Sequence, residues 1–316
     1  MAFSVSSLTD YINQESTKLL VRSFYENKST QYYGTVQTGI KLTDAIQLLS
    51  VVAYPQADTS CSNTASGTTA FTQRNITVGA IKYHDTLCPL TLRTKWTQKL
   101  LRPGSNGEQQ SLSFEQDIAN NLVNLVKEHI ETADWQGDTT SGDAVKRMYD
   151  GWIKIIDAAG TAIVGNTGNV TTGTGITSGA SGNADTLINT TVDARTENIK
   201  NNSNQVFFIG TDWFDKYTTT LMAKNLFHTD ATAWANYEMM IPGRNVKLVG
   251  VPGLSGTNRG FLGVDTNFVL GTDMENEYET FKMWYSEDDD NLKYTIRFKR
   301  GVQVAYPSEI VQFKLV

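Results

Sequence analysis

The side chains most often used in catalysis and metal binding are few in this chain and lie far apart. Its three histidines, His84, His129 and His228, form neither an H-E-x-x-H pattern nor a pair with a cysteine at metal-binding spacing. Cys61 and Cys88 are too few for a disulfide framework and lack C-x-x-C spacing, so we interpret them as two free thiols. We therefore expect no metal, no cofactor and no enzymatic activity.

Glycine-rich and acidic segments also lack the spacing that their chemistry needs. Gly253-Leu254-Ser255-Gly256 is not a nucleophile elbow, and Gly173-Thr174-Gly175 has no third glycine at the dinucleotide-binding spacing. The run Asp288-Asp289-Asp290 offers carboxylates, but it lacks the alternating ligands and the glycine of a calcium loop. We interpret this run as a solvated turn.

Another group of charged residues lies near the C-terminus. Apolar and mostly basic residues alternate there, with Leu292, Tyr294, Ile296 and Phe298 on one face and Lys293, Thr295, Arg297 and Lys299 on the other. This period of two predicts a strand with one buried and one basic face. Such a face can meet phosphate, the acidic run beside it or a neighbouring subunit, and we favour the neighbouring subunit.

Composition narrows the class of protein. The chain has 316 residues, of which 19% are charged and 40% hydrophobic, and its net charge is −6. A polar surface with few charges suits extensive protein contacts, because little charge is desolvated on association. The negative total charge gives the chain as a whole no attraction for nucleic acid. We expect no signal peptide, because no basic region followed by an apolar run opens the sequence, and no membrane span, because no apolar run is long enough.

Residues 49–92 predict a long β-hairpin. Residues 49–54 form the outgoing strand, the polar stretch Thr59 to Thr69 forms the tip around Gly67, and Phe71 to Leu92 form the return strand. The tip has no apolar side chains with which to pack on its own domain. It is either a disordered surface loop or a loop that lies on another subunit. We predict that residues 57–70 are needed for assembly and not for folding.

The strongest helix prediction is Leu112 to Ala133, with Ser113 as its N-cap. Its apolar residues share one face, at Leu112, Ile118, Leu122, Leu125, Val126, Ile130 and Ala133. We also expect helices over 185–201 and from 212 to about 227, and strands over 205–210, 246–251, 268–270 and 279–285. Residues 165–183 are rich in Gly, Thr and Asn and predict a long mobile loop.

The order of these elements resembles the major capsid protein family of tailed bacteriophages, with its Hong Kong 97-like fold. Two segments carry the likeness: Asp134-Trp135-Gln136-Gly137-Asp138 at the end of the long helix, and residues 294–298 followed by a strand over 301–307. The resemblance implies an α+β fold with an N-terminal arm (1–48), an extended β-hairpin loop (49–92) and two domains. The peripheral domain would comprise 93–145 and 281–316, with a spine helix over 112–133, and the axial domain 146–280.

The resemblance also implies a function. The chain would assemble with itself into hexamers and pentamers of an icosahedral head that encloses double-stranded DNA, in a virion assembled in the host cytoplasm. Portal, a separate scaffold protein and decoration proteins would be partners, and DNA would make weak non-specific contact. The candidate intersubunit contacts are Ser66, Gly67, Phe71, Lys82, Arg297 and Lys299. The alternatives are an encapsulin-like nanocompartment shell protein and a β-rich surface adhesin or carbohydrate-binding protein.

Overall fold

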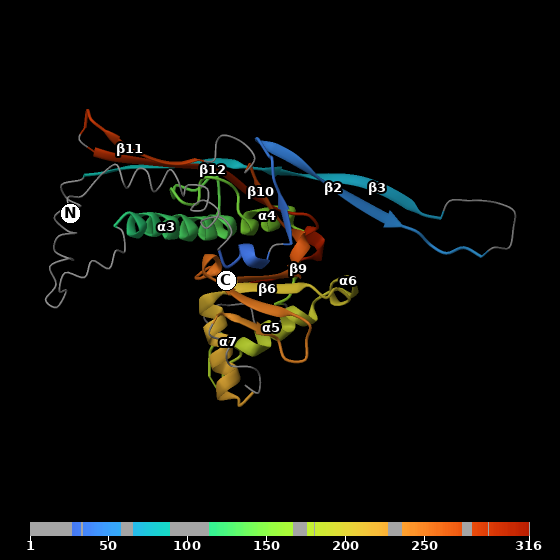
Figure 1. Cartoon of the computed structure of the whole chain (residues 1–316). Helices are drawn as coiled ribbons and strands as arrows, with labels where there is room; N and C mark the ends of the chain where they lie inside the picture. Colours follow the sequence, from blue (N-terminus) through green and yellow to red (C-terminus); the bar gives the residue numbers. More distant parts are fainter. Residues whose placement is uncertain are drawn as a thin grey trace.

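A computed structural model of the chain describes residues 27–32, 34–57, 66–88, 114–166, 176–179, 181–226, 236–273, 280–289 and 291–315. The strands of these residues form a five-stranded sheet, a six-stranded sheet and a two-stranded hairpin, so the predicted α+β class is confirmed. Figure 1 shows the five-stranded sheet above the long helix α3 (Phe114–Gln136), with the six-stranded sheet below and the hairpin projecting to one side. Residues 1–26 of the predicted arm lie outside the described residues.

The five-stranded sheet is built around one long strand. Its members are β1 (Thr35–Gln37), β4 (Gly79–Leu87), β10 (Phe268–Thr272), β11 (Thr280–Ser286) and β12 (Asn291–Val304). β12 runs antiparallel to β4 along one edge and to β11 and then β10 along the other. The predicted alternation is confirmed for Ile296 and Phe298, which are buried, and for Arg297 between them, which is exposed, whereas Thr295 of the basic face is buried.

The continuity of β12 corrects one prediction. The sequence predicts two strands with a break before Gly301, whereas β12 is a single strand of 14 residues. A Cβ atom at Gly301 would lie 2.2 Å from the carbonyl oxygen of Thr77. Glycine here therefore lets another backbone segment approach the strand closely and does not end it.

The hairpin prediction also needs correction. The outgoing strand β2 (Thr43–Val52) begins earlier than predicted, and the return divides into β3 (Thr68–Thr77) and β4. β3 pairs with β2, and β4 pairs with β12. The division falls at Val78, which is buried and whose N–H donates to the carbonyl oxygen of Leu42. The chain therefore leaves the hairpin there and joins the sheet.

Helix α3 confirms the predicted spine helix with shifted bounds. Its 23 residues give a length of about 35 Å at 1.5 Å per residue. Its buried apolar stripe includes Val123, Val126, Ile130 and Ala133. Leu125, which the prediction placed on the buried face, is 42% exposed because it lies one position outside this stripe. Ser113, the predicted cap, lies outside the described residues.

The six-stranded sheet has helices on one face and the Trp135 region on the other. Its strands, in order, are β5 (Ile163–Val164), β13 (Val311–Lys314), β9 (Arg259–Val264), β6 (Gln205–Gly210), β8 (Lys247–Val251) and β7 (Glu238–Met240). Helices α5 (Ala184–Asp193) and α7 (Thr211–Ala223) cover one face. The short helix α4 (Trp152–Ala159) packs between α3 and β12. Short 3-10 helices are η1 (Thr30–Tyr32), η3 (Pro252–Leu254), η4 (Asp265–Asn267) and η5 (Pro307–Glu309).

Strand pairing crosses the predicted domain boundaries. β13, near the C-terminus, belongs to the six-stranded sheet, and β10, from the predicted axial segment, belongs to the five-stranded sheet. The helix predicted over 185–201 is two helices, α5 and α6 (Glu197–Lys200). Arg195 lies in the break and its side chain donates to the carbonyl oxygen of Val192 and to Gln205 of β6. These bonds fix a turn that helical periodicity alone does not reveal.

Trp135 joins the two sheets into one core. Its ring centroid lies 4.9 Å from that of Trp152, 5.2 Å from Phe208 and 5.8 Å from Phe261. Phe208 and Phe261 come from the six-stranded sheet, whereas Phe268, at 6.2 Å, comes from the five-stranded sheet. Aromatic clusters of this kind bury large areas and resist relative movement of the elements that they join.

A buried polar network lies beside this aromatic cluster. Arg300 of β12 donates to both carboxylate oxygens of Asp134 in α3, with Nη2 2.7 Å from Oδ2, and both side chains are fully buried. The Tyr149 hydroxyl donates to the same carboxylate at 2.6 Å. Burial and this carboxylate raise the pKa of Tyr149, so the phenol keeps the proton that it donates. The network ties the long helix to the central strand.

Glu131 extends this network toward the segment before β1. The Ser29 hydroxyl donates to the Glu131 carboxylate and accepts a hydrogen bond of 2.7 Å from the Trp135 indole. Burial raises the pKa of Glu131 to about 7, helped by the nearby Asp134 carboxylate and opposed by the Ser29 bonds and Arg300.

This pKa predicts a pH-dependent stability. The pKa of Glu131 rises on folding from 4.5, so its contribution to stability is fully present below pH 4.5 and is lost as pH rises through 7. By linkage the loss amounts to about 3 kcal/mol. We expect the unfolding free energy of E131Q to lack this decrease as pH rises from 4.5 to 7. Urea unfolding of the unassembled subunit at pH 5 and pH 8 measures it, and equal slopes in the two proteins would contradict the prediction.

Candidate functional site

Among the described elements, the hairpin of β2 and β3 is the one that packs least against the rest of its own chain. Each strand has ten residues, and within the described residues the two strands form a sheet of their own. Ten residues at 3.3 Å each extend about 33 Å. Figure 1 shows the hairpin reaching away from both sheets and from α3. A two-stranded hairpin alone is only marginally stable in water, so a projection of this length calls for contacts from elsewhere.

One face of the hairpin is packed only at its base. The register places Leu48, Ile46 and Ile76 on the same face, since residues opposite each other in an antiparallel pair point to the same side. Leu48 and Ile76 are buried there, against a cluster that includes Ile40 and Val269. Beyond Leu48 this face carries exposed residues that are mostly small, at Ser50, Val52, Thr68 and Ala70.

The opposite face carries an exposed apolar cluster, which we call the hairpin patch: Leu49, Val51 and Phe71. Leu49 lies directly opposite Phe71, and Val51 is two residues further along the same face. Their exposed fractions are 52% for Leu49, 60% for Val51 and 77% for Phe71. Contiguous apolar side chains with this exposure are typical of a protein interaction site.

Two of the predicted contact residues lie at the outer end of the described hairpin. The Ser66 hydroxyl donates to the carbonyl oxygen of Tyr54 at 2.6 Å. A Cβ atom at Gly67 would lie 2.3 Å from the carbonyl oxygen of Val52, so the strands approach closely there. Both residues thus have a local role in closing the hairpin, and their contact with a neighbour stays a prediction. Residues 58–65 of the predicted tip lie outside the described residues.

The other predicted contacts lie on the five-stranded sheet. Lys82 of β4 and Arg297 of β12 are directly opposite each other and both are exposed. Lys299 makes an ion pair of 2.7 Å with the buried Asp273 and donates to the carbonyl oxygen of Lys41. Lys299 therefore has a role within its own subunit, and the intersubunit contacts of all three remain predictions.

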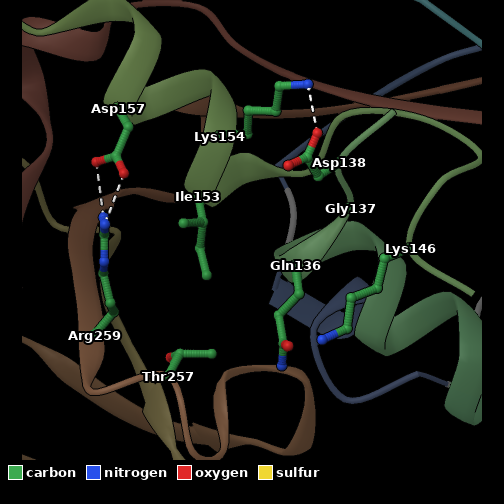
Figure 2. A pocket seen from close by; sticks show the side chains of 9 residues that line it. All are labelled: Gln136, Gly137, Asp138, Lys146, Ile153, Lys154, Asp157, Thr257 and Arg259. Carbon is green, nitrogen blue, oxygen red and sulfur yellow. Dashed lines mark hydrogen bonds and ion pairs between the residues drawn. The ribbon is translucent and has the colours of Figure 1, made fainter. Parts of the chain in front are cut away.

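A pocket of about 400 Å³ lies where α3 ends, beside α4 and β9. Figure 2 shows its lining, which is Gln136, Gly137, Asp138, Lys146, Ile153, Lys154, Asp157, Thr257 and Arg259. Arg259 forms a two-pronged pair with Asp157, at 2.7 Å for each bond, and Lys154 pairs with Asp138 at 2.8 Å. The hydrogen bonds from Lys154 and Thr140 hold the pKa of Asp138 well below its ordinary value. The carboxylates of Asp138 and Asp157 in this pocket are thus engaged in structural ion pairs. Neither is placed to act as a general acid or base.

The remaining residues that the sequence offered for chemistry take part in packing or in ion pairs. His129 stacks on Tyr83, with its Nδ1 3.3 Å from the hydroxyl, as expected of a packing histidine. Gly253 packs against α3, where a Cβ atom would lie 2.3 Å from the Glu131 carbonyl oxygen. The acidic run begins the turn between β11 and β12, and Asp289 pairs with Lys293. Among the residues that the structure describes, no three His, Cys, Asp or Glu side chains gather as a metal site.

Of the cysteines and histidines in the sequence, Cys88 is exposed, and Cys61 and His228 lie outside the described residues. Sequence reasoning missed Leu49 and Val51, which it assigned to an ordinary strand. The signal for them was present, because 48–52 is apolar almost throughout and does not alternate, a pattern of strands covered on both faces. Of the described helices, none is long and apolar enough to cross a membrane.

Comparison with solved structures identifies the fold. No model of a protein family matches the sequence, and neither does any curated protein. A chain of the satellite phage P4 procapsid is similar over 99% of this chain and 91% of its own length, with a TM-score of 0.62 and 10% identity. Chains of the capsid of the native GTA particle (92% and 90%) and of Gordonia phage Cozz (92% and 87%) both align with a TM-score of 0.56 and 12% identity. The chain therefore has the fold of phage capsid proteins, as the resemblance implied.

Proposed function

We propose that this chain, which has the fold of phage capsid proteins, is a non-enzymatic shell subunit, the major capsid protein of a tailed bacteriophage. It assembles with itself into hexamers and pentamers of an icosahedral head that encloses double-stranded DNA. The observation that carries the proposal is the hairpin, whose exposed apolar patch has no cover among the described residues of its own chain. In a shell, the patch of one copy packs on its neighbour.

The physics of a closed shell favours such a projecting element. Interfaces between copies in rings of five or six are heterologous, so each copy offers one surface and receives another. An extended hairpin buries area on a neighbour without a core of its own. The low share of charged residues, 19%, limits the desolvation cost of many simultaneous contacts. Many moderate contacts then act together in the assembled shell.

The proposed division of the chain follows the resemblance. Residues 1–48 form an arm, 49–92 the extended loop, 93–145 and 281–316 the peripheral domain, and 146–280 the axial domain. Ser66, Gly67, Phe71, Lys82, Arg297 and Lys299 remain the candidate contacts between copies. Portal, a separate scaffold protein and decoration proteins are the further proposed partners, in a virion assembled in the host cytoplasm.

Negative-stain microscopy of the purified protein tests the proposal directly. We expect uniform icosahedral particles or rings of five or six copies. A monodisperse monomer that binds glycans would overturn it in favour of an adhesin. Particles that contain a co-purifying cargo enzyme instead of DNA would assign the same fold to a nanocompartment shell.

Deletion of residues 57–70 tests the role of the hairpin tip. The deletion removes the three outermost rungs of the β2–β3 ladder, at Ser50–Ala70, Val51–Thr69 and Val52–Thr68, and leaves the packed base around Leu48 and Ile76. We expect a soluble subunit with an unchanged circular dichroism spectrum and no particles in the microscope. Normal particles from this variant would show that the tip is dispensable.

A further inference from the structure

The outward face of the five-stranded sheet gathers basic and aromatic side chains. The register of β4, β11 and β12 places on the face opposite α3 a set that includes nine residues: Lys82, His84, Thr86, Lys282, Trp284, Lys293, Thr295, Arg297 and Lys299. The other face carries Tyr83 and Phe298, which pack toward α3. We call the nine-residue set the basic face. It contains no acidic side chain, although the whole chain has a net charge of −6.

Three cations of the basic face lack an ionic partner within the described residues. Lys293 pairs with Asp289 and Lys299 with Asp273, but Lys82, Lys282 and Arg297 form no ion pair there. Lys82 and Arg297 are moreover opposite each other on adjacent strands, and Lys282 lies beside them, opposite Thr295. Like charges directly opposite in a sheet destabilise it. An anion bound between them would remove this repulsion.

Two aromatic rings lie beside these cations. His84 and Trp284 stack across β12, with ring centroids 6.1 Å apart, and Trp284 is 41% exposed. His84 is held in place by a contact of 2.9 Å between its Nδ1 and the Thr295 hydroxyl. An exposed indole costs hydration free energy unless a partner covers it. A surface that combines cations with aromatic rings suits single-stranded nucleic acids, because phosphates contact the cations and bases stack on the rings.

We propose that the basic face binds nucleic acid. Lys82, Arg297 and Lys282 contact backbone phosphates, and Trp284 receives a base. For Lys82 and Arg297 this assignment is the alternative to the contact between copies named above. The rings favour nucleic acid over an acidic protein segment, which would need the cations alone. The inference goes beyond the proposed function, in which the particle encloses double-stranded DNA, because a base on Trp284 requires an unpaired strand. It does not depend on assembly, because the face is formed within one chain.

The test measures binding of fluorescent 20-nucleotide DNA, single-stranded and duplex, to the full-length unassembled protein by anisotropy at several salt concentrations. We expect K82E/R297E to weaken binding by roughly tenfold or more and to lower the salt dependence by about one unit for each lost phosphate contact. W284A should weaken binding of the single strand by roughly fivefold or more and leave the duplex nearly unchanged. The matched control K200E/K314E makes the same change of charge at exposed lysines of α6 and β13.

Several results would overturn the inference. An equal loss of DNA affinity in K82E/R297E and in the control K200E/K314E would show that total charge alone governs binding. Polyglutamate that competes as well as DNA of equal charge would reassign the face to an acidic protein. Circular dichroism checks that each variant is folded. Microscopy of W284A separates this inference from the proposed function, because Trp284 is not among the candidate contacts between copies and particles can form whether or not it binds DNA.

Discussion

The double variant L49D/F71D is expected to abolish particle formation while leaving the subunit folded. Leu49 and Phe71 are opposite each other on the hairpin patch and exposed by 52% and 77%, so few contacts within the subunit are lost. The free energy of unfolding should change by less than about 1 kcal/mol. In a neighbour's interface the same aspartates would be buried without a partner, at a cost of several kcal/mol per contact, on the order of the largest interface substitutions. Each copy would lose this contact, and the shell would not close.

The hairpin itself provides the matched control for this experiment. Ser50 and Ala70 form the next pair along the ladder, are also exposed, and point to the opposite face. S50D/A70D therefore adds the same charge to the same strands, and we expect particles to form in appreciable yield. Gel filtration and negative-stain microscopy measure assembly, and urea unfolding measures stability. If both double variants assemble normally, the hairpin patch is not an interface.

Substitution of either partner in the Asp134–Arg300 pair should cause the largest loss of stability in the subunit. Both side chains are fully buried, and D134N leaves the guanidinium charge of Arg300 in the core without its carboxylate. Breaking one side of a buried pair costs about 3–5 kcal/mol, a large part of the roughly 5–15 kcal/mol that holds a typical domain folded. The Tyr149 hydroxyl also loses a charged acceptor.

A double-mutant cycle separates the pair from general damage to the core. R300Q alone should destabilise about as much as D134N, whereas D134N/R300Q, with both charges removed, should lose clearly less than the sum. The exposed pair of Glu197 and Lys200 on α6 is the control, and E197A should cost less than about 0.5 kcal/mol. Additive losses in the cycle would mean that the two side chains act independently. Urea unfolding at pH 7 provides all four free energies.

Local patterns predicted much of the fold because each depends on residues that are neighbours in sequence. The stripe of Val126, Ile130 and Ala133 predicted α3, and the alternation from Leu292 to Lys299 predicted β12. Errors arose where a distant segment decides the local structure. Gly301 suggested a break, but the Thr77 backbone lies against it, and the predicted helix over 185–201 is interrupted where Arg195 bonds to Gln205.

The candidate site was predictable only in part for the same reason. Phe71, Lys82 and Arg297 were chosen as separate candidates, and their sequence positions carry no information about pairing. Strand register then placed Phe71 opposite Leu49 and Lys82 opposite Arg297. Trp284 was predicted only as part of the strand over 279–285 and not as a site residue, because its exposure and its stacking on His84 depend on the neighbouring strands.

The sequence by itself determined the class of this protein: an α+β chain with a long amphipathic helix, a long hairpin with a polar tip and no recognisable catalytic motif. Only the tertiary structure decided which apolar residues of the hairpin are buried at its base and which are left uncovered. Leu48 and Leu49 are adjacent and chemically identical, yet one is 8% and the other 52% exposed. Successive side chains of a strand point to opposite faces, and only the arrangement of the sheets determines which face has something to pack against.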